Sequence, residues 1–242
     1  MLNQDMRDVI HRSKKYGWVL EPEAKRMLSW AGIPVPAFRW VTTLPEALAA
    51  AEDIGYPVVA KIVSPAIVHK SEVNGVAVGL EDADALTEVF SGFSKLEGFA
   101  GILIEPLVSG IELIIGAKID YQFGPIILLG IGGTGVEIYQ DTALRMAPLS
   151  DNDVTSMVES LKGAKLLKGY RGAEPIDMPA LIRLVHHFSV LVMDLADQVL
   201  AIDFGKPIMI GTPREVQTNE DVIRAYLGEP HAIADGTTGD AR

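Results

Sequence analysis

Residues 57–76 place a lysine inside an apolar strand and a histidine in the loop that follows it. The segment reads PVVAKIVSPAIVHKSEVNGV. Burying the ammonium of Lys61 among apolar β residues is costly unless that group meets an anion. The dipeptide His69-Lys70 stands in the next loop, where it is placed to meet the same anion. The segment therefore predicts a strand that carries a phosphate-handling site, with His69 as a candidate nucleophile.

Lys61 and His69 also have a plainer interpretation. Lys61 would then belong to an edge strand, with its stem on apolar surface and its ammonium in water. His69 would be an ordinary surface histidine of a loop. Because apolar residues flank Lys61 on both sides, the sequence favours the anion-binding interpretation of the lysine.

The composition limits the class of protein. The chain has 242 residues, 48% hydrophobic and 22% charged, enough for one large domain or two small ones. Its net charge of −11 argues against binding to nucleic acid. It has no cysteine, which excludes disulfides, thiolate zinc sites and cysteine catalysis. The N-terminus is polar, and glycines and a proline interrupt the longest uncharged run, 121–136. We therefore expect a cytoplasmic globular protein with no membrane span.

Helical and strand patterns alternate along the chain without a strict βαβ repeat. This favours an α+β fold with mixed sheets in two lobes over a doubly wound sheet. Amphipathic runs with polar caps or terminal glycines predict helices, and runs rich in Ile, Leu and Val predict strands. The expected helices are 20–31, 46–54, 82–93, 150–163 and 179–195, and the expected strands are 37–41, 57–63, 75–80, 102–105, 111–119 and 125–129.

The stretch Ile104-Glu105-Pro106-Leu107-Val108 ends one strand and begins a turn before Glu112. The backbone N–H and C=O of such a strand end can pair with an adenine edge, and a nearby carboxylate can bind ribose hydroxyls. The alternative is a plain connection between two strands with two solvated acids.

The stretch GIGGTG at 130–135 formally matches the dinucleotide-binding pattern G-x-G-x-x-G. It lies in the middle of the chain, and an extended-looking VEIY follows it rather than a helix, so a glycine loop that lines a phosphate pocket is more natural. Glu137, Asp141 and Arg145 follow as a surface ion-pair set or as the lining of a phosphate or metal site. His186 and His187 point about 100° apart on a helix, so we interpret them as non-ligands.

Taken together, the stretches EPEAKRMLSWAGIPVP, GYPVVAKIVSPAIVHKSEVNGVAVGL, GILIEPLVSGIELIIGAKIDYQFGPIILLGIGGTGVEIYQDTALRMAPL and LLKGYRG resemble the ATP-grasp β subunit of ADP-forming acyl-CoA (acetyl-CoA) synthetases. The resemblance runs from about Leu20 to about Ser189. It implies an ATP-grasp fold, in which two α+β lobes clasp ATP and Mg²⁺. The implied reaction is acyl-CoA + ADP + phosphate ⇌ acid + CoA + ATP, run through phosphohistidine relays.

The resemblance also assigns roles to three of the candidate residues. Lys61 matches the lysine that contacts ATP phosphates, and His69 matches the β-subunit histidine that receives the phosphoryl group before passing it to ATP. Glu112 matches the ribose-binding acid. The family usually has Gly-Gly where this chain has Asn74-Gly75, a departure that we expect to stiffen the loop.

The resemblance places Glu105, Leu107 and Val108 on the adenine hinge. The family then closes with a Glu-x-Asp-x-Asn-Pro strand and an Asp-containing strand that help to hold magnesium. Here residues 191–228 instead resemble the C-terminal end of the ATPase subunits of branched-chain amino acid ABC transporters. The chain has no Walker A lysine loop and no ABC signature. We expect residues 201–204 to take the place of the missing strand, which would leave Asp203 as the remaining acid for a metal.

The sequence thus predicts five segments: an N-terminal extension (1–19), a first lobe (20–100), a second lobe (101–190), an ABC-like tail (191–230) and a disordered end (231–242). The leading hypothesis is an enzyme subunit that uses ATP or ADP with Mg²⁺ and needs a separate CoA-binding α subunit in a hetero-oligomer. The alternative is a nucleotide-binding module with a broken metal site. A third hypothesis, a protein associated with an ABC transporter, rests on the tail alone.

Overall fold

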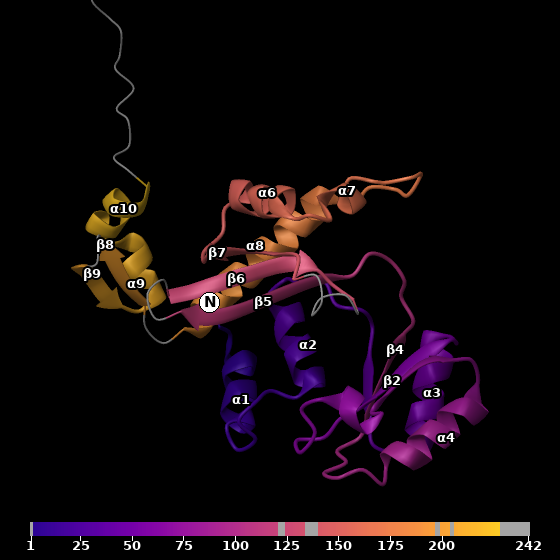
Figure 1. The fold of residues 1–242 in the computed structure, drawn as a ribbon. Coiled ribbons are helices and arrows are strands. Elements are labelled where there is room, and N and C mark those ends of the chain that lie inside the picture. Colours follow the sequence, from indigo (N-terminus) through magenta and orange to yellow (C-terminus); the bar gives the residue numbers. More distant parts are fainter. Residues whose placement is uncertain (1, 121–123, 134–139, 197–198, 204–205, 228–242) are drawn as a thin grey trace, which may run out of the picture.

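The computed structural model describes residues 2–120, 124–133, 140–196, 199–203 and 206–227. Two lobes, each a sheet with helices, make up most of these residues, and a small unit near the C-terminus follows them (Figure 1). The arrangement confirms the α+β class expected from the sequence.

The first lobe contains a four-stranded sheet in the order β1-β4-β2-β3, with every neighbouring pair antiparallel. Helices α3 and α4 cover one face, against which Val58, Ala60 and Ile62 of β2 and Ile102 and Ile104 of β4 are buried. Each fully buried valine or isoleucine among them contributes roughly 1.5–3 kcal/mol, and Ala60 less. The elements are β1 (Arg39–Val41), α3 (Leu44–Ile54), β2 (Val58–Ile62), the 3₁₀ turn η1 (Lys70–Val73), β3 (Val76–Leu80), α4 (Ala83–Phe93) and β4 (Ile102–Pro106).

The second lobe contains a three-stranded antiparallel sheet in the order β5-β6-β7. Ile127 and Leu129 of β6 and Ala143 of β7 point to the face that α6 and α8 cover, where they join a buried core with Met157 and Val185. The elements are β5 (Leu113–Asp120), β6 (Gly124–Ile131), β7 (Thr142–Met146), α6 (Asp151–Ser160), α7 (Ala164–Leu167) and α8 (Met178–Leu195).

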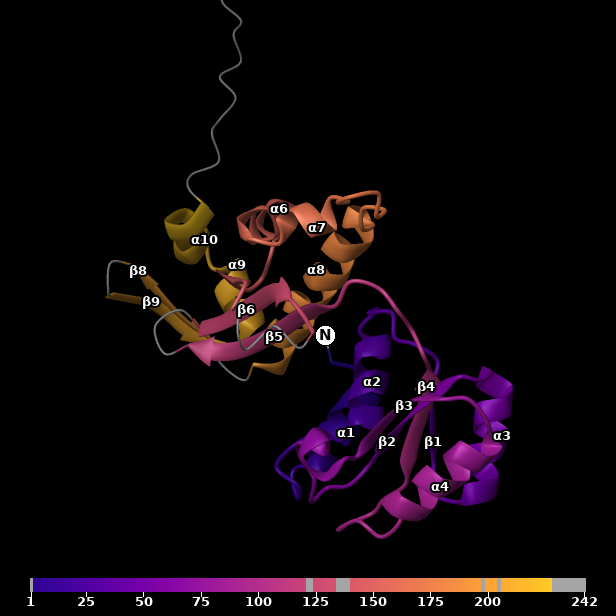
Figure 2. The same ribbon diagram turned by 45° about the vertical axis from the view of Figure 1, so that its right-hand side comes forward.

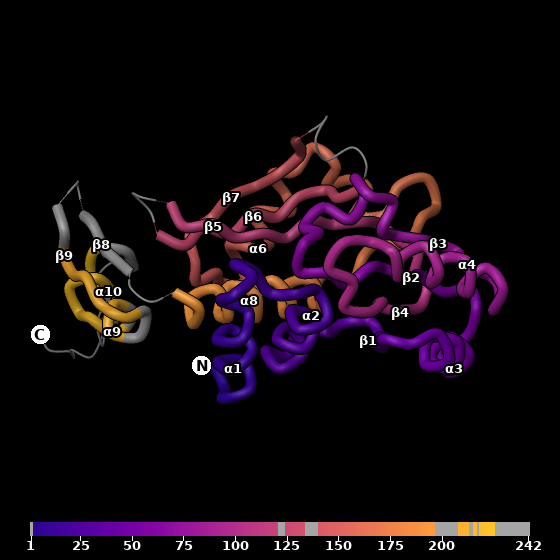
Figure 3. The backbone as a smooth tube through the Cα atoms, turned by 90° about the horizontal axis from the view of Figure 1, so that it is seen from below, coloured from indigo at the N-terminus to yellow at the C-terminus, as the bar shows by residue number. Residues whose placement is uncertain are grey.

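Helices α1 (Gln4–Ser13) and α2 (Glu21–Trp30) connect the two lobes. Met6 and Val9 of α1 and Met27 of α2 are buried together with Leu191 of α8. Figures 1 and 3 show α1 and α2 beside α8, and Figure 2 shows α2 on the opposite side of the first sheet from α3. Helix α2 therefore packs on α8 of the second lobe while it covers the open face of the first sheet.

Helix α8 is 18 residues long and apolar enough, by length and composition, to cross a membrane. In the fold, however, it is a packing helix. Leu181 and Val185 are buried against the second sheet, and Leu191 is buried against α1 and α2. Its apolar composition is thus explained by contacts on two sides within the protein.

The C-terminal unit consists of β8 (Val199–Asp203), β9 (Lys206–Gly211), α9 (Pro213–Thr218) and α10 (Glu220–Leu227). Strands β8 and β9 pair with each other in a two-stranded sheet. Within the part of the chain that the structure describes, β8 makes no ladder with the second sheet. The expectation that residues 201–204 take the place of the missing strand stays a prediction, since residue 204 lies outside the described residues.

The structure changes several boundaries. Strand β4 is an inner strand of the first sheet, so the first lobe extends to Pro106 rather than to residue 100. The described strand pairs are antiparallel, not mixed. Residues 1–19 include the packed helix α1 rather than a bare extension. The expected helix 150–163 ends at Ser160, and α7 follows as a separate turn. The sequence did not predict strand β7. The expected disordered end, residues 231–242, lies outside the described residues.

Candidate functional site

Lys61 lies on an inner strand. Strand β2 pairs with β4 on one side and β3 on the other, and Lys61 stands opposite Leu103 and Val76. The alternation of the strand turns Lys61 away from the α3/α4 core and toward α2. The edge-strand interpretation of Lys61 is therefore wrong, and the lysine needs an anion, as the sequence predicted.

Two glutamates supply that anion. The Lys61 ammonium contacts the Glu105 carboxylate of β4 and lies 3.0 Å from Glu21 Oε1 of α2. Glu21 Oε2 is in turn 3.0 Å from Lys70 Nζ, and Glu105 Oε2 is 2.7 Å from Lys25 Nζ. We call these five residues the lysine–glutamate cluster. Three ammonium groups and two carboxylates give it a net charge of +1.

In this cluster the pKa values of Lys61 and Glu21 are both shifted in favour of the charged forms. Burial lowers the pKa of Lys61, but hydrogen bonds and charges from Glu105 and Glu21 outweigh burial and hold that pKa above its ordinary value of 10.5. Burial raises the pKa of Glu21, but Lys70 and Lys61 overcome this and keep that pKa below 4.5. Glu105 is only 7% exposed. Its Oε2 forms an ion pair with the Lys25 ammonium, although the two groups are not oriented for a hydrogen bond.

His69 directly precedes Lys70 of this cluster in the chain. It precedes η1 in the loop between β2 and β3, and its side chain is exposed. The Gly75 amide donates to the Lys70 carbonyl at 2.7 Å and closes the loop, while a Cβ atom at residue 75 would overlap Ile62. Asn74 has φ +52°, a left-handed conformation that asparagine tolerates better than most residues. The Asn-Gly pair therefore fits the turn in place of Gly-Gly.

The chain crosses between the lobes over residues 107–112. Leu107 and Val108 are exposed in this crossing, next to the end of β4. Glu112 lies beside the start of the glycine loop, since the Gly132 amide donates to the Glu112 carbonyl at 2.7 Å. A Cβ atom at residue 132 would come within 2.9 Å of the Glu112 backbone, so the close approach requires glycine. The structure thus brings Glu112 and the glycine loop together.

Asp141 and Arg145 have structural partners. The Asp141 carboxylate accepts hydrogen bonds from the Lys162 and Gly163 amides, both at 2.7 Å, and so holds the turn between α6 and α7. Arg145 donates to Ser156 on α6 at 3.0 Å, from the face of β7 that the helices cover. This geometry does not support the expectation that these two residues line a phosphate or metal site.

Glu137 lies outside the described residues, and so does the side chain of Asp203. Among the described residues, no group of three or more His, Asp or Glu side chains is arranged to hold a metal ion. The predicted metal-site lining at these positions therefore stays a prediction, and we assign no Mg²⁺ ligands.

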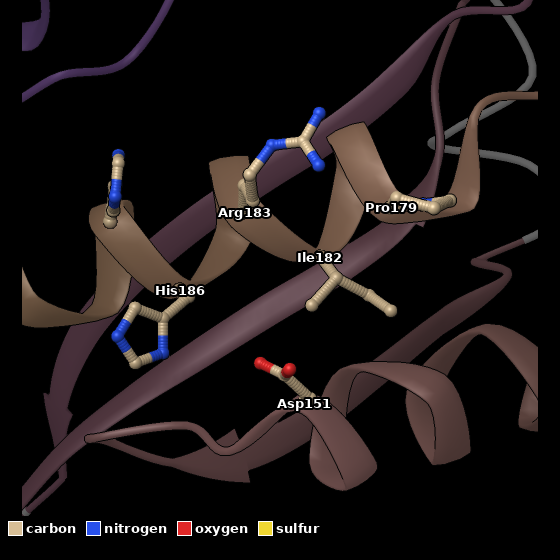
Figure 4. A pocket seen from close by; sticks show the side chains of 6 residues that line it. Asp151, Pro179, Ile182, Arg183 and His186 are labelled. Carbon is tan, nitrogen blue, oxygen red and sulfur yellow. The ribbon is translucent and has the colours of Figure 1, made fainter.

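A separate open cavity of about 400 Å³ lies between α6 and α8. Figure 4 shows Ile182 and His186 pointing from α8 toward the side of Asp151, whereas Arg183 points the other way. The His186 ring bonds to the Leu149 carbonyl and the His187 ring to the Gly32 carbonyl, each at 3.0 Å. None of the predicted site residues lines this cavity.

Sequence reasoning missed Glu21 and Lys25. A signal was present, because residues four apart on a predicted helix share a face. That spacing alone does not say which surface the face meets. The contact between α2 and the first sheet depends on packing between segments 40 residues or more apart.

The ATP-grasp domain family matches residues 11–217. The beta subunit of acetate–CoA ligase [ADP-forming] II from Pyrococcus furiosus is 38% identical, over 79% of this chain and 84% of its own length. The 4-hydroxybutyrate–CoA ligase [ADP-forming] of Nitrosopumilus maritimus is also 38% identical, over 78% of this chain, but the match spans only 29% of that longer protein.

A solved structure is similar to most of this chain. It is the dinucleotide forming acetyl-coenzyme A synthetase 1 of Ca. Korarchaeum cryptofilum in complex with coenzyme A and Mg-AMPPCP, with its phosphohistidine segment pointing towards the nucleotide binding site. The sequence identity is 36% and the TM-score 0.69, over 86% of this chain and 93% of that chain.

The tail matches a different family. Residues 206–232 match the family described as branched-chain amino acid ATP-binding cassette transporter. The branched-chain amino acid transport ATP-binding protein LivG of Salmonella typhimurium is 48% identical over 48 residues, 20% of this chain and 19% of that protein. The resemblance of the tail to such ATPases is thus confirmed, over a small part of either chain.

Proposed function

Since the chain belongs to the ATP-grasp β-subunit family of ADP-forming acyl-CoA synthetases, we propose that it transfers a phosphoryl group between His69 and ADP or ATP. The observation that carries this proposal is the lysine–glutamate cluster, in which Lys70 directly follows the exposed His69. An excess of positive charge next to a neutral imidazole suits the attack of that imidazole on a phosphoryl group.

The residues would divide the work as follows. Lys61, Lys70 and Lys25 would hold phosphate oxygens, because each ammonium is already turned into one site and the cluster retains one positive charge. Leu107 and Val108 would present backbone groups of the crossing segment to adenine, and Glu112 would accept hydrogen bonds from ribose hydroxyls. The hinge place that the resemblance gives to Glu105 stays a proposal, and its buried carboxylate would in addition orient Lys25 and Lys61.

In the transfer step an imidazole nitrogen of His69 attacks the terminal phosphorus of ATP. The N–P bond forms while the bond from that phosphorus to the bridging oxygen breaks, and ADP leaves with the electron pair. The reverse step, attack of ADP on the phosphohistidine, makes ATP. The lysines stabilise the phosphate charge in both directions.

We also propose Mg²⁺ as a companion of the nucleotide. Mg²⁺ typically enters nucleotide sites on substrate phosphates with one or two protein carboxylates. The similar solved structure holds Mg-AMPPCP. When bound, the ion would neutralise phosphate charge, but no described residue is assigned to it.

The partner proposed here is a CoA-binding α subunit. Relatives of similar length are named beta subunits, whereas the N. maritimus ligase is several times longer than the segment matched by this chain. The acyl-CoA half of the reaction would therefore be supplied by another chain in a hetero-oligomer, with the pair in the cytoplasm, where ATP and coenzyme A are available.

A second candidate function is nucleotide binding without turnover. The observation that favours it is the tail, which matches a transporter family and pairs only with itself among the described strands. Calorimetry of ATP binding with and without Mg²⁺ separates the two candidates. Affinity that does not depend on Mg²⁺ supports the binding module, and affinity that requires Mg²⁺ supports the enzyme.

The test of the transfer itself is labelling with [γ-³²P]ATP and Mg²⁺. We expect acid-labile label on the wild type and on His11→Ala, which alters an exposed histidine of α1, and none on His69→Ala. Undiminished label on His69→Ala would overturn the assignment of His69.

A further inference from the structure

The two carboxylates of the lysine–glutamate cluster differ in their surroundings. The Glu105 side chain is 9% exposed and lies within the sheet, whereas the Glu21 side chain is 24% exposed on the first turn of α2. Each Glu21 oxygen faces a different ammonium, Lys61 and Lys70, at 3.0 Å. Glu21 thus places two anionic oxygens between the cations that we propose as phosphate ligands.

The Lys70 contact reaches the segment that carries His69. Lys70 follows His69 directly and begins η1. Its carbonyl accepts the Gly75 amide at 2.7 Å, and its ammonium is held by Glu21. The side chain of Lys70 is only 16% exposed although it belongs to a surface loop. The ion pair with Glu21 therefore ties the His69 loop to α2.

Glu21 also stands on the helix that joins the lobes. The buried Met27 of α2 packs with α1 and with Leu191 of α8. The other end of α2 reaches β2 and the His69 loop through Glu21. The tether of the loop is thus fixed to an element that both lobes hold in place.

We propose that Glu21 is a positioning residue that acts as an internal substitute for phosphate. Without nucleotide it bridges Lys61 and Lys70 and holds the His69 loop. A nucleotide phosphate, which carries more charge, takes over the two ammonium groups and displaces the carboxylate. Glu21 therefore weakens nucleotide binding, and it keeps the His69 loop ordered until a nucleotide binds. This inference rests on the proposed function, yet the tether itself can be tested without any nucleotide.

The chain offers a matched control for Glu21→Gln. Glu23 lies on the same first turn of α2, but its partners are Arg12 at 3.7 Å and Arg26 at 3.3 Å, outside the cluster. Glu23→Gln removes the same charge from the same helix without touching Lys61 or Lys70. Comparing the two variants distinguishes the loss of the Glu21 contacts with Lys61 and Lys70 from the general effect of removing a negative charge from α2.

The first measurement is amide hydrogen exchange of residues 69–75 in the full chain without nucleotide. Losing a charge-assisted tether predicts about tenfold faster exchange in Glu21→Gln and no change in Glu23→Gln. Exchange in Lys70→Gln should be as fast as in Glu21→Gln, and no faster in the double variant, because both changes break the same ion pair between Glu21 and Lys70. Unchanged exchange in Glu21→Gln overturns the proposal, whether or not the protein transfers phosphate.

The second measurement compares ADP affinity, by calorimetry, with the rate at which ATP labels His69. Removing the competing carboxylate predicts roughly three- to tenfold tighter ADP binding in Glu21→Gln. Labelling at saturating ATP should not be slower than in the wild type, because the bound phosphate has already displaced Glu21 there. Glu21→Asp should bring the ADP affinity part of the way back to that of the wild type. A merely structural role would weaken ADP binding and slow labelling together, and that result overturns the proposal. Failure of the wild type to bind ADP would refute the proposed function, while the exchange comparison still decides the tether.

Discussion

Because Glu105 is buried, removing its charge should change the free energy of unfolding by a measurable amount. The substitution Glu105→Gln keeps the shape of the side chain and removes one negative charge. It leaves Lys25 and Lys61, with side chains only 15% and 24% exposed, facing an amide that cannot neutralise them. The net charge of the cluster rises from +1 to +2 in a region that α2 shields from water.

The magnitude follows from this burial. Removing one partner of a buried ion pair costs about 3–5 kcal/mol. Because both lysines keep some contact with water, we expect the lower end, about 3 kcal/mol, which for a protein of this size corresponds to a fall in Tm of roughly 6–12 °C. Adding Lys25→Met to Glu105→Gln should restore part of the loss, since it removes one of the two unneutralised charges.

The assay is urea unfolding followed by circular dichroism and by tryptophan fluorescence, with the midpoints compared. Glu159→Gln is the matched control, because Glu159 pairs with Lys168 at 3.7 Å on the surface, where both side chains are more than 60% exposed. Exposed pairs of this kind contribute little, so we expect no measurable shift. Equal midpoints for Glu105→Gln and Glu159→Gln would refute the argument that burial gives the cluster its strength.

Four further outcomes follow from the same geometry. Gly75→Ala should lower the free energy of unfolding by about 1–3 kcal/mol, because the added methyl overlaps the buried core. Gly92→Ala lies at an exposed helical position with open space and should raise the free energy of unfolding by about 0.5 kcal/mol. Chemical denaturation measures both changes. Since the folded pKa of Glu21 is lowered, its stabilisation is present above pH 4.5 and lost as the pH falls through the folded pKa, so the difference in Tm between wild type and Glu21→Gln should shrink only in acid. Asp141→Ala should cost about 1–3 kcal/mol, because two backbone amides lose their acceptor, with unchanged ADP affinity by calorimetry. A chain that ends at residue 196 should also keep its ADP affinity, and a large loss would show that the tail contributes to the nucleotide site.

The sequence predicted the parts of the site that depend on local pattern. An ammonium inside an apolar strand requires an anion wherever the strand is placed, so Lys61 was identified correctly as a paired residue. The identity of the pairing groups could not be predicted, because Glu21 and Lys25 reach β2 and β4 only through the packing of α2 on the sheet. For the same reason the partners of Asp141 could not be predicted, since the Lys162 and Gly163 amides lie 21 and 22 residues away along the chain.

Strand β4 shows why the lobe boundary was misplaced. Its first four residues are all buried, and nothing in the local sequence tells whether such a strand begins a new sheet or completes the previous one. The register settles this, since Ile104 stands opposite both Arg39 of β1 and Ala60 of β2. Because β4 is an inner strand, Glu105 at its end meets Lys61 across a single ladder. The shift of boundary that places β4 in the first lobe therefore also explains why the Glu105 carboxylate belongs to the cluster.

The pairing of the strands in the tail affects the choice between the two candidate functions. If β8 had joined the second sheet, the position of Asp203 in the chain would have tied the tail to the nucleotide site. Instead β8 pairs with β9, and the described residues of the lysine–glutamate cluster come from α2, β2, β4 and the His69 loop alone. The lysine–glutamate cluster, which we propose to bind phosphate, is thus assembled upstream of the transporter-like segment. The change of family along the chain therefore leaves His69 and its cations in place, and the two functions differ in metal dependence rather than in phosphate binding.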